Sequence, residues 1–188
     1  MQNSGFGNTI NPLLSLADPK VYSIPMLLVI GWRGEPDVKD EPQHVKQGEV
    51  SETLLKTLEI PYVVISDKIE NIDKVISDAT KHAEDNSEPY AILVRKGTFE
   101  PYSLKTKTKT NFDLNREEAI IKSTELLSDS DIIVATTGKT SRELFEYRAR
   151  NNQGHHRDFL TVGGMGHANQ IALGIALAKP NKTVYCFD

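Results

Sequence analysis

The sequence predicts an α/β protein, with a mostly parallel β-sheet covered by helices on both faces. Two observations support this fold class. Short apolar or β-branched runs alternate with segments of helical periodicity along the 188 residues, and this alternation is the pattern that builds parallel sheets. The composition, with 38% hydrophobic and 26% charged residues, is that of a folded chain rather than a disordered one.

The first half of the chain contains three predicted strands and two predicted helices. The strands are short apolar runs at residues 25–30, 62–65 and 90–94. The helices are expected at residues 50–58 and 72–83, and the second of them places apolar side chains at positions i, i+3, i+4 and i+7. Each predicted helix therefore separates two strands, as a parallel sheet requires.

Two other segments of this half, residues 3–8 and 31–48, are predicted to lack regular structure. The first, NSGFGN, is expected to be a glycine-rich turn, in which glycines permit close approach of the backbone to a ligand. The second holds several glycines and prolines among many charges. Long loops inside compact domains are more often functional or mobile than idle, so residues 31–48 are a candidate binding site. Residues 3–8 are a second candidate, with an ordinary strand-to-helix turn as the alternative.

Residues 96–114 carry no apolar periodicity and are predicted to be a linker between two structural units. The run KTKTKT within them leaves an exposed edge strand as an alternative. After the linker, Asn115 and Glu118 give the N-x-x-E capping pattern that starts a helix. A second capping box is predicted at Thr140 and Glu143. Further elements are expected as strands at 131–135, 159–162 and 183–187, a helix that ends at Arg148, and a helix at 168–178.

Composition also excludes several classes of protein. The net charge of −4 argues against a broad nucleic-acid surface. The single cysteine, Cys186, supports neither a disulfide framework nor a cysteine zinc site, and we expect it to be a buried core residue. No stretch reaches the ~20 apolar residues of a membrane span, and the first residues do not resemble a signal peptide. A cytoplasmic protein is therefore expected.

The 31–48 loop contains cations that could bind an anionic substrate. Arg33 offers a two-pronged guanidinium that fits a phosphonate or a carboxylate, and Lys39 adds a second positive charge. The alternative is a solvated loop whose mixed charges pair with one another.

Two turns in the second half are further candidates. Thr137 and Gly138 follow an apolar strand and precede a helix, whose free N–H groups and positive dipole favour an anion. An ordinary capped helix is the alternative. Met165 is a large flexible hydrophobe among three glycines and could pack under an aromatic ring, although a tight turn with a core methionine has the same pattern. The adjacent His155 and His156 lack a third ligand and are not assigned to a metal.

Four segments, taken together, are distinctive. In chain order they are QNSGFGNTINPLLSL, RGEPDVKDEPQHVKQG, TTGKTSRELFE and DFLTVGGMGHANQIALGIALAKP. They resemble the phosphonopyruvate decarboxylase family of thiamine diphosphate-dependent 2-oxo acid decarboxylases. The related sulfopyruvate decarboxylases share much of this pattern. The resemblance extends over nearly the whole chain and is least specific over residues 66–130.

The resemblance implies a thiamine diphosphate-binding fold with parts of two domains. Residues 1–95 correspond to the later part of a pyrimidine-binding domain, and residues 115–188 to the first part of a diphosphate-binding domain. Thiamine diphosphate and Mg²⁺ are the implied cofactors, and Met165 matches the residue that holds the former in its bent form. The implied cofactor-binding residues are Asn3, Ser4 and Gly5 in the first domain, and Thr137, Gly138, Gly164 and Met165 in the second.

The implied reaction is decarboxylation of 3-phosphonopyruvate to phosphonoacetaldehyde and CO2 within a complete enzyme, with Arg33 or Lys39 holding the phosphonate. The family's activating glutamate and its Gly-Asp-Gly metal motif are expected outside these residues. The chain is therefore expected to be cut short at both ends, and no catalytic residue or metal ligand is assigned. The alternatives are a sulfopyruvate decarboxylase, or a non-catalytic fragment or subunit that needs a partner chain. A homo-oligomer without nucleic-acid or membrane partners is expected.

Overall fold

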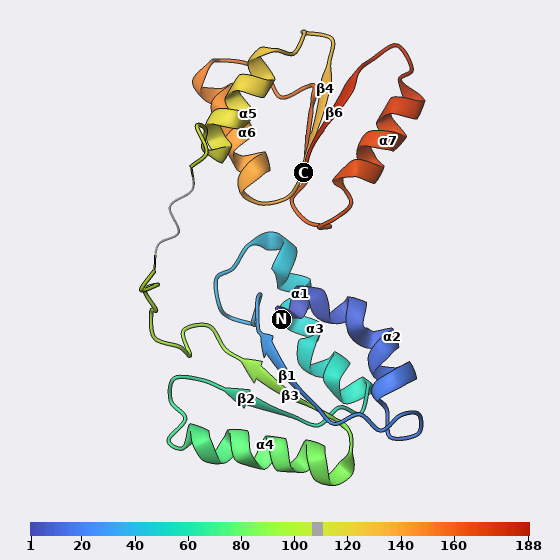
Figure 1. Cartoon of the computed structure of the whole chain (residues 1–188), viewed down its shortest axis with the longest axis vertical. Helices are drawn as coiled ribbons and strands as arrows, with labels where there is room; N and C mark the ends of the chain where they lie inside the picture. Colours follow the sequence, from blue (N-terminus) through green and yellow to red (C-terminus); the bar gives the residue numbers. More distant parts are fainter. Residues whose placement is uncertain (107–110) are drawn as a thin grey trace. The chain divides into compact units, whose positions relative to one another are not determined.

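The computed structural model describes residues 1–106 and 111–188, and it confirms the predicted α/β class, with two small parallel sheets flanked by helices (Figure 1). The chain divides into two compact units, Met1–Lys105 and Thr106–Asp188. The division falls within the range 96–114, whose described residues form neither helix nor strand. Residues 107–110, which hold most of the KTKTKT run and of the possible edge strand, lie outside the described residues.

The sheet of the first unit has the strand order β1-β3-β2, and both pairs of strands are parallel. The β-α-β connections that join these strands follow from this parallel pairing. The predicted strands and the second predicted helix are confirmed, with ends shifted by a few residues. The elements are β1 (Met26–Gly31), α3 (Pro42–Thr57), β2 (Tyr62–Ile65), α4 (Ile72–Asn86) and β3 (Pro89–Val94).

Helices cover both faces of this sheet. One face packs against α3 and the N-terminal segment, where Phe6 and Leu55 are almost completely buried. The other face packs against α4 through Ala79, which meets Ile92 and Val94 of the central strand. The core of the unit therefore lies on both sides of β3, as the near-continuous apolar sequence of that strand predicts.

The segment predicted to be a glycine-rich turn is helical instead. It runs through α1 (Asn3–Phe6), a 3₁₀ turn η1 (Gly7–Thr9), α2 (Ile10–Pro12) and a π-helical turn η2 (Leu13–Ala17). Gly5 and Gly7 do not adopt the positive φ for which a turn would use glycine. Phe6, Leu13 and Ala17 are buried on one side of the segment, so packing on the sheet favours the helix.

The prediction of a loop over residues 31–48 is correct only as far as Glu41, because α3 begins at Pro42 rather than near residue 50. Proline is well tolerated in the first helical turn, where its fixed φ suits the helix and its missing N–H would have no partner. Gly48 is a buried residue within the helix, although glycine in a sequence favours a loop. Contacts described below explain why this helix contains a glycine.

The second unit repeats the same design. Its sheet has the order β5-β4-β6 with parallel pairing throughout. Helices α5 and α6 pack on one face, with Ile133 and Leu144 at the centre, while α7 packs on the other face against Val134. The elements are α5 (Arg116–Glu125), β4 (Ile132–Ala135), α6 (Lys139–Arg150), β5 (Asp158–Leu160), α7 (Ala168–Ala178) and β6 (Val184–Phe187).

One of the two predicted capping boxes is present. The Asn115 side chain accepts from the Glu118 backbone N–H at 2.9 Å, and the Glu118 carboxylate accepts from the Asn115 N–H at 2.8 Å. The box at Thr140 and Glu143 is wrong, because α6 begins at Lys139 after an N-cap glycine. The Glu143 carboxylate instead accepts two hydrogen bonds from Arg116 of α5, so it joins two helices.

Cys186 is exposed, contrary to the prediction of a buried thiol. It lies on β6, an edge strand of the described sheet, and an edge strand is covered less completely than the central strand β4. None of the helices in the described residues combines the length and the apolar content needed to cross a membrane.

Candidate functional site

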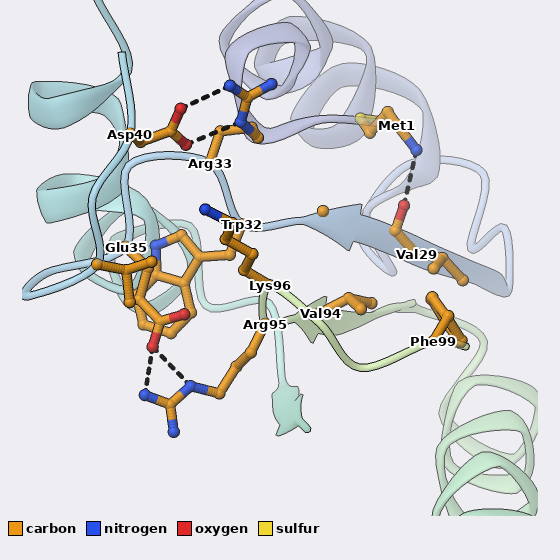
Figure 2. Close-up of a pocket in the computed structure, with 12 residues that line it drawn as sticks. Met1, Val29, Trp32, Arg33, Glu35, Asp40, Val94, Arg95, Lys96 and Phe99 are labelled. Carbon is orange, nitrogen blue, oxygen red and sulfur yellow. Dashed lines mark hydrogen bonds and ion pairs between the residues drawn. The ribbon is translucent and has the colours of Figure 1, made fainter. Parts of the chain in front are cut away.

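A pocket of about 520 Å³ lies in the first unit at the carboxyl ends of β1 and β3 (Figure 2). Gly31 ends β1 and Val94 ends β3; these strands are adjacent and parallel, so the residues after them emerge at the same edge. Open α/β sheets bind their ligands at this edge. The pocket is lined by Met1, Val29, Gly31, Trp32, Arg33, Glu35, Val38, Asp40, Val94, Arg95, Lys96 and Phe99.

Arg33, which the sequence proposes as a substrate ligand, is bonded to Asp40. Its Nε and Nη2 atoms donate to the two carboxylate oxygens at 2.8 and 2.5 Å. Asp40 also accepts from the backbone N–H groups of Gly34 and Glu41 and contacts His44 Nδ1 at 3.1 Å. These bonds, led by that from Arg33, hold the pKa of Asp40 well below its usual range, and Asp40 raises the pKa of Arg33.

Asn3 fixes the start of the same loop. Its Nδ2 donates to the Arg33 carbonyl at 2.7 Å and to Ser51 Oγ of α3 at 2.9 Å, while its Oδ1 accepts from the Arg33 N–H at 3.1 Å. The side chain is buried. Both amide hydrogens of Asn3 are therefore used inside the fold, which ties α1, the loop and α3 to one another.

Two glycines bring the loop directly onto helix α3. A Cβ added to Gly48 would lie 1.6 Å from the Gly34 carbonyl oxygen, and one added to Gly34 would lie 2.0 Å from the His44 carbonyl oxygen. Gly34 also has a φ of +67°, which favours glycine. Trp32 Nε1 donates to the Gly48 carbonyl at 2.9 Å. The close approach explains the glycine inside α3 and fixes the indole in the pocket wall.

A second ion pair lines the pocket next to the end of β3. Glu35 is almost completely buried and accepts from Arg95 Nε at 2.6 Å. The hydrogen bond to Glu35 raises the pKa of Arg95. Because Arg95 follows β3 and Glu35 follows β1, the pair joins the two segments that leave the sheet.

The two lysines of this region are less constrained. Lys39 and Lys96 are both exposed, and Lys96 Nζ donates to the Lys39 backbone carbonyl at 3.3 Å. In residues 1–106 and 111–188, neither ammonium group lies within ion-pair distance of a carboxylate. Figure 2 shows the Lys96 side chain between the Arg33–Asp40 pair and the Glu35–Arg95 pair.

The candidate residues of the second unit also meet at the carboxyl edge of their sheet. Thr137 follows β4, and its hydroxyl donates to the Val162 carbonyl at 2.6 Å, so it contacts the segment that follows β5. Gly138 has a φ of +88° and forms the N-cap of α6, where no side chain caps the helix. The first turn of α6 therefore presents backbone N–H groups beside Lys139.

The glycine-rich loop after β5 leaves Met165 exposed. Gly164 and Gly166 have φ values of +68° and +79°, and the Met165 side chain is 76% exposed. The segment is therefore a tight turn, but Met165 is not the core methionine that the alternative interpretation predicted.

Within each unit the structure thus brings the predicted residues together. In the first, Asn3 and Arg33 are directly bonded, Ser4 and Gly5 follow in the same short helix, and Lys39 lies in the loop that Arg33 begins. In the second, the Thr137–Val162 bond brings the turn at 137–138 next to the loop at 163–166.

The sequence reasoning missed several residues of the pocket. Two of them could have been predicted from their position in the sequence. Arg95 and Lys96 directly follow the buried strand YAILV and therefore lie at the edge of the sheet where ligands bind. The roles of the other pocket residues depend on contacts between segments that are distant in the sequence, and a local sequence pattern does not predict such contacts. The residues missed outright are Trp32, Arg95 and Lys96, whereas Glu35 and Asp40 belong to the loop acids for which pairing with cations was the alternative expectation.

Comparison with known proteins agrees with the motifs. No family model matches the chain. Phosphonopyruvate decarboxylase of Streptomyces viridochromogenes is 30% identical over 97% of this chain and 48% of the relative, and that of Streptomyces hygroscopicus is 31% identical over the same shares. Sulfopyruvate decarboxylase subunit alpha of Methanococcus maripaludis is 42% identical over 50% of this chain and 54% of the relative.

The chain is accordingly a homologue of decarboxylases. Within that class, the matches that extend along the chain are to phosphonopyruvate decarboxylases, and the predicted resemblance to this family is confirmed. The chain spans about half the length of these curated relatives.

Proposed function

We propose that this chain supplies part of a thiamine diphosphate-dependent decarboxylase that converts 3-phosphonopyruvate to phosphonoacetaldehyde and CO2. The similarity to two phosphonopyruvate decarboxylases over 97% of the chain carries this proposal. On this proposal, residues 1–95 belong to a pyrimidine-binding domain and residues 115–188 to a diphosphate-binding domain. In both units the candidate residues lie at the carboxyl edge of a parallel sheet, which supports the assignment.

The residues of the second unit fit parts of the proposed cofactor. The uncapped start of α6, with Lys139 beside it, suits an anionic diphosphate. A Cβ on Gly138 would meet no atom within 4 Å, so the space next to that backbone is open. Met165 presents a flexible thioether to solvent, and such a side chain packs well against an aromatic ring. When bound, thiamine diphosphate supplies the electron sink for loss of CO2.

The residues of the first unit would bind and orient the acid. Arg33 keeps its Nη1 group for a ligand, because Asp40 takes only Nε and Nη2. The ion pairs and glycine contacts hold the loop in place before any ligand arrives, which lowers the entropy cost of orienting a substrate. The described residues contain no group of three or more His, Cys, Asp or Glu side chains that could hold a metal, so Mg²⁺ rests on the resemblance alone.

Sulfopyruvate is the second candidate substrate. Three relatives are named sulfopyruvate decarboxylase subunit alpha, with identities of 42%, 39% and 40% over shorter stretches. Both acids have three carbons and a tetrahedral anion, so one pocket could accept either. The name of these relatives also supports the proposal that this chain acts with other subunits, either as a homo-oligomer or with a different partner chain.

The test is a decarboxylation assay on the protein that contains this chain. CO2 release is measured with phosphonopyruvate, sulfopyruvate and pyruvate, each with and without thiamine diphosphate and Mg²⁺. We expect turnover that requires thiamine diphosphate and is fastest with phosphonopyruvate. Turnover that is faster with sulfopyruvate would favour the second substrate, and absence of turnover with all three acids would contradict the proposal.

A further inference from the structure

The charges around the pocket of the first unit are unevenly paired. Five charged side chains line it: two acids, Glu35 and Asp40, and three bases, Arg33, Arg95 and Lys96. Each acid is bonded to one arginine. Within each ion pair the two charges cancel, so the ammonium group of Lys96 is the side-chain charge that remains.

From this arrangement we propose that Lys96 binds the tetrahedral anion of the substrate, a phosphonate or a sulfonate. This inference rests on the proposed function, since it assigns a specificity-determining residue to the same site. It differs from the prediction from sequence, which gave that role to Arg33 or Lys39.

The position of Lys96 suits a ligand. It lies two residues after the end of β3, at the carboxyl edge of the sheet. Its side chain lines the pocket and lies between the two ion pairs in the view of Figure 2. The one hydrogen bond that its ammonium makes to a described residue, to the Lys39 carbonyl, is long at 3.3 Å. An anionic oxygen would replace this neutral acceptor favourably, because charge-assisted hydrogen bonds are shorter and stronger.

The arginines are less suited to the same role. Arg33 and Arg95 each spend their Nε and one Nη group on a carboxylate, so a ligand would meet a neutralised pair. A lysine acts as a compact point charge, which is a common way to bind phosphate groups. Trp32, Val94 and Phe99 supply apolar wall around it, and apolar surroundings strengthen an electrostatic contact.

The alternative is that Lys96 is a solvated surface lysine, and the chain provides a direct way to decide. Trp32 is the sole tryptophan of the sequence and lines the pocket, so its fluorescence reports occupancy without any need for turnover. The probe is 3-phosphonopropionate, a stable three-carbon acid with the same anion, and 3-sulfopropionate distinguishes sulfonate from phosphonate. Propionate, which lacks the tetrahedral group, is the control ligand.

We expect a saturable change in Trp32 fluorescence with 3-phosphonopropionate and none with propionate at the same concentration. Lys96→Met should weaken binding about tenfold or more, since one charged hydrogen bond is lost. Lys96→Arg should retain most of the affinity. The matched control is Lys74→Met, which alters a lysine of α4 that is 73% exposed and lies outside the pocket; it should bind like the wild type.

The inference is overturned if the wild type shows no saturable binding by fluorescence and by calorimetry, or if Lys96→Met binds as tightly as the wild type. Failure of the proposed function gives a different result, namely Lys96-dependent binding of the probe without decarboxylation of any of the three acids. Where turnover occurs, Lys96→Met should raise KM for phosphonopyruvate about tenfold and leave KM for pyruvate unchanged, as loss of uniform binding predicts.

Discussion

The loops that follow β1 and β5 are built in opposite ways. The loop after β1 is tied down by a bidentate ion pair at Asp40, a buried amide at Asn3 and a backbone contact between Gly34 and Gly48. The loop after β5 has two glycines with positive φ and exposes Met165. The first is pre-organised by the chain itself, so its substitutions should change stability. Substitutions in the second should change function with little effect on stability.

The largest expected effect comes from Gly48→Ala. The added Cβ would lie 1.6 Å from the Gly34 carbonyl oxygen, and backbone cannot move aside as a flexible side chain can. We expect the free energy of unfolding of the first unit to fall by ~3 kcal/mol, the upper end for overpacked sites. Urea denaturation followed by Trp32 fluorescence measures it.

Gly174→Ala is the matched control, because it also adds a methyl group to a helical glycine. Nothing lies within 4 Å of that Cβ, so the second unit should gain up to ~1 kcal/mol from helix propensity alone. Circular dichroism and hydrogen exchange at α7 would show this gain. Equal effects of the two substitutions would mean that the loop does not approach α3 as described.

Asn3→Ala should have the next largest effect. It removes three hydrogen bonds and leaves the Arg33 backbone N–H and carbonyl without those partners. We expect a loss of ~2–3 kcal/mol, since an unsatisfied buried polar group carries its full desolvation cost. Asn8→Ala, an exposed asparagine of the same segment, should stay within ~0.5 kcal/mol. Equal urea midpoints for the two variants would contradict the role of Asn3.

Asp40→Asn should cost less, ~1–2 kcal/mol at pH 7, because the Arg33 side chain is 38% exposed and solvent screens the pair. The pKa of Asp40 is held well below its usual range, so the native state favours the charged form. The contribution of the Asp40 carboxylate to the free energy of unfolding is therefore complete above the pKa of ~3.9 that it has in the unfolded chain, and it is lost as the pH falls further.

Urea unfolding of the wild type and of Asp40→Asn at pH 7, 5 and 3 tests the direction of this pH dependence. The difference in free energy of unfolding between the two proteins should be the same at pH 7 and 5 and smaller at pH 3. Asp78→Asn, which breaks an exposed contact of 3.8 Å with Lys74, should show little difference at any of the three. A wild-type advantage that grows toward pH 3 would contradict the assignment.

The same contrast explains how much of the fold was predictable. Strands such as β2 and β3 are short apolar runs, and α7 is an apolar run that begins after a glycine turn, so local sequence determines them. The start of α3 and the helical segment from Asn3 were missed, because glycine and proline there favour loops locally. Packing on the sheet and the Gly34–Gly48 contact override that preference, and neither is visible in a local window.

The candidate site shows the same limit. The cations of the first unit and the glycine turns of the second unit were identifiable from residue type, whereas the predicted glycine turn at residues 3–8 is helical. The ion-pair partners of the cations could not be identified from the sequence, because Glu35 and Arg95 are 60 positions apart in the chain. Asp40 lies closer to Arg33, but nothing in the sequence selects it over the other acids of that loop. The unpaired charge of Lys96 becomes visible only after both arginines have been assigned a partner.

The smallest effect on stability is expected for Met165→Ala. The side chain is 76% exposed, so its truncation removes little buried surface, and the free energy of unfolding should change by less than ~0.5 kcal/mol. Leu177→Ala is a matched control in the same unit, with a side chain that is 75% exposed, and it should be equally neutral. The two variants should separate in function. Under the proposed role in holding the cofactor ring, Met165→Ala lowers kcat for phosphonopyruvate about tenfold, a barrier increase of ~1.4 kcal/mol, while Leu177→Ala leaves it unchanged. If both variants kept full activity, the exposed methionine would be only part of a flexible turn, and the glycine loop after β5 would lose its proposed role.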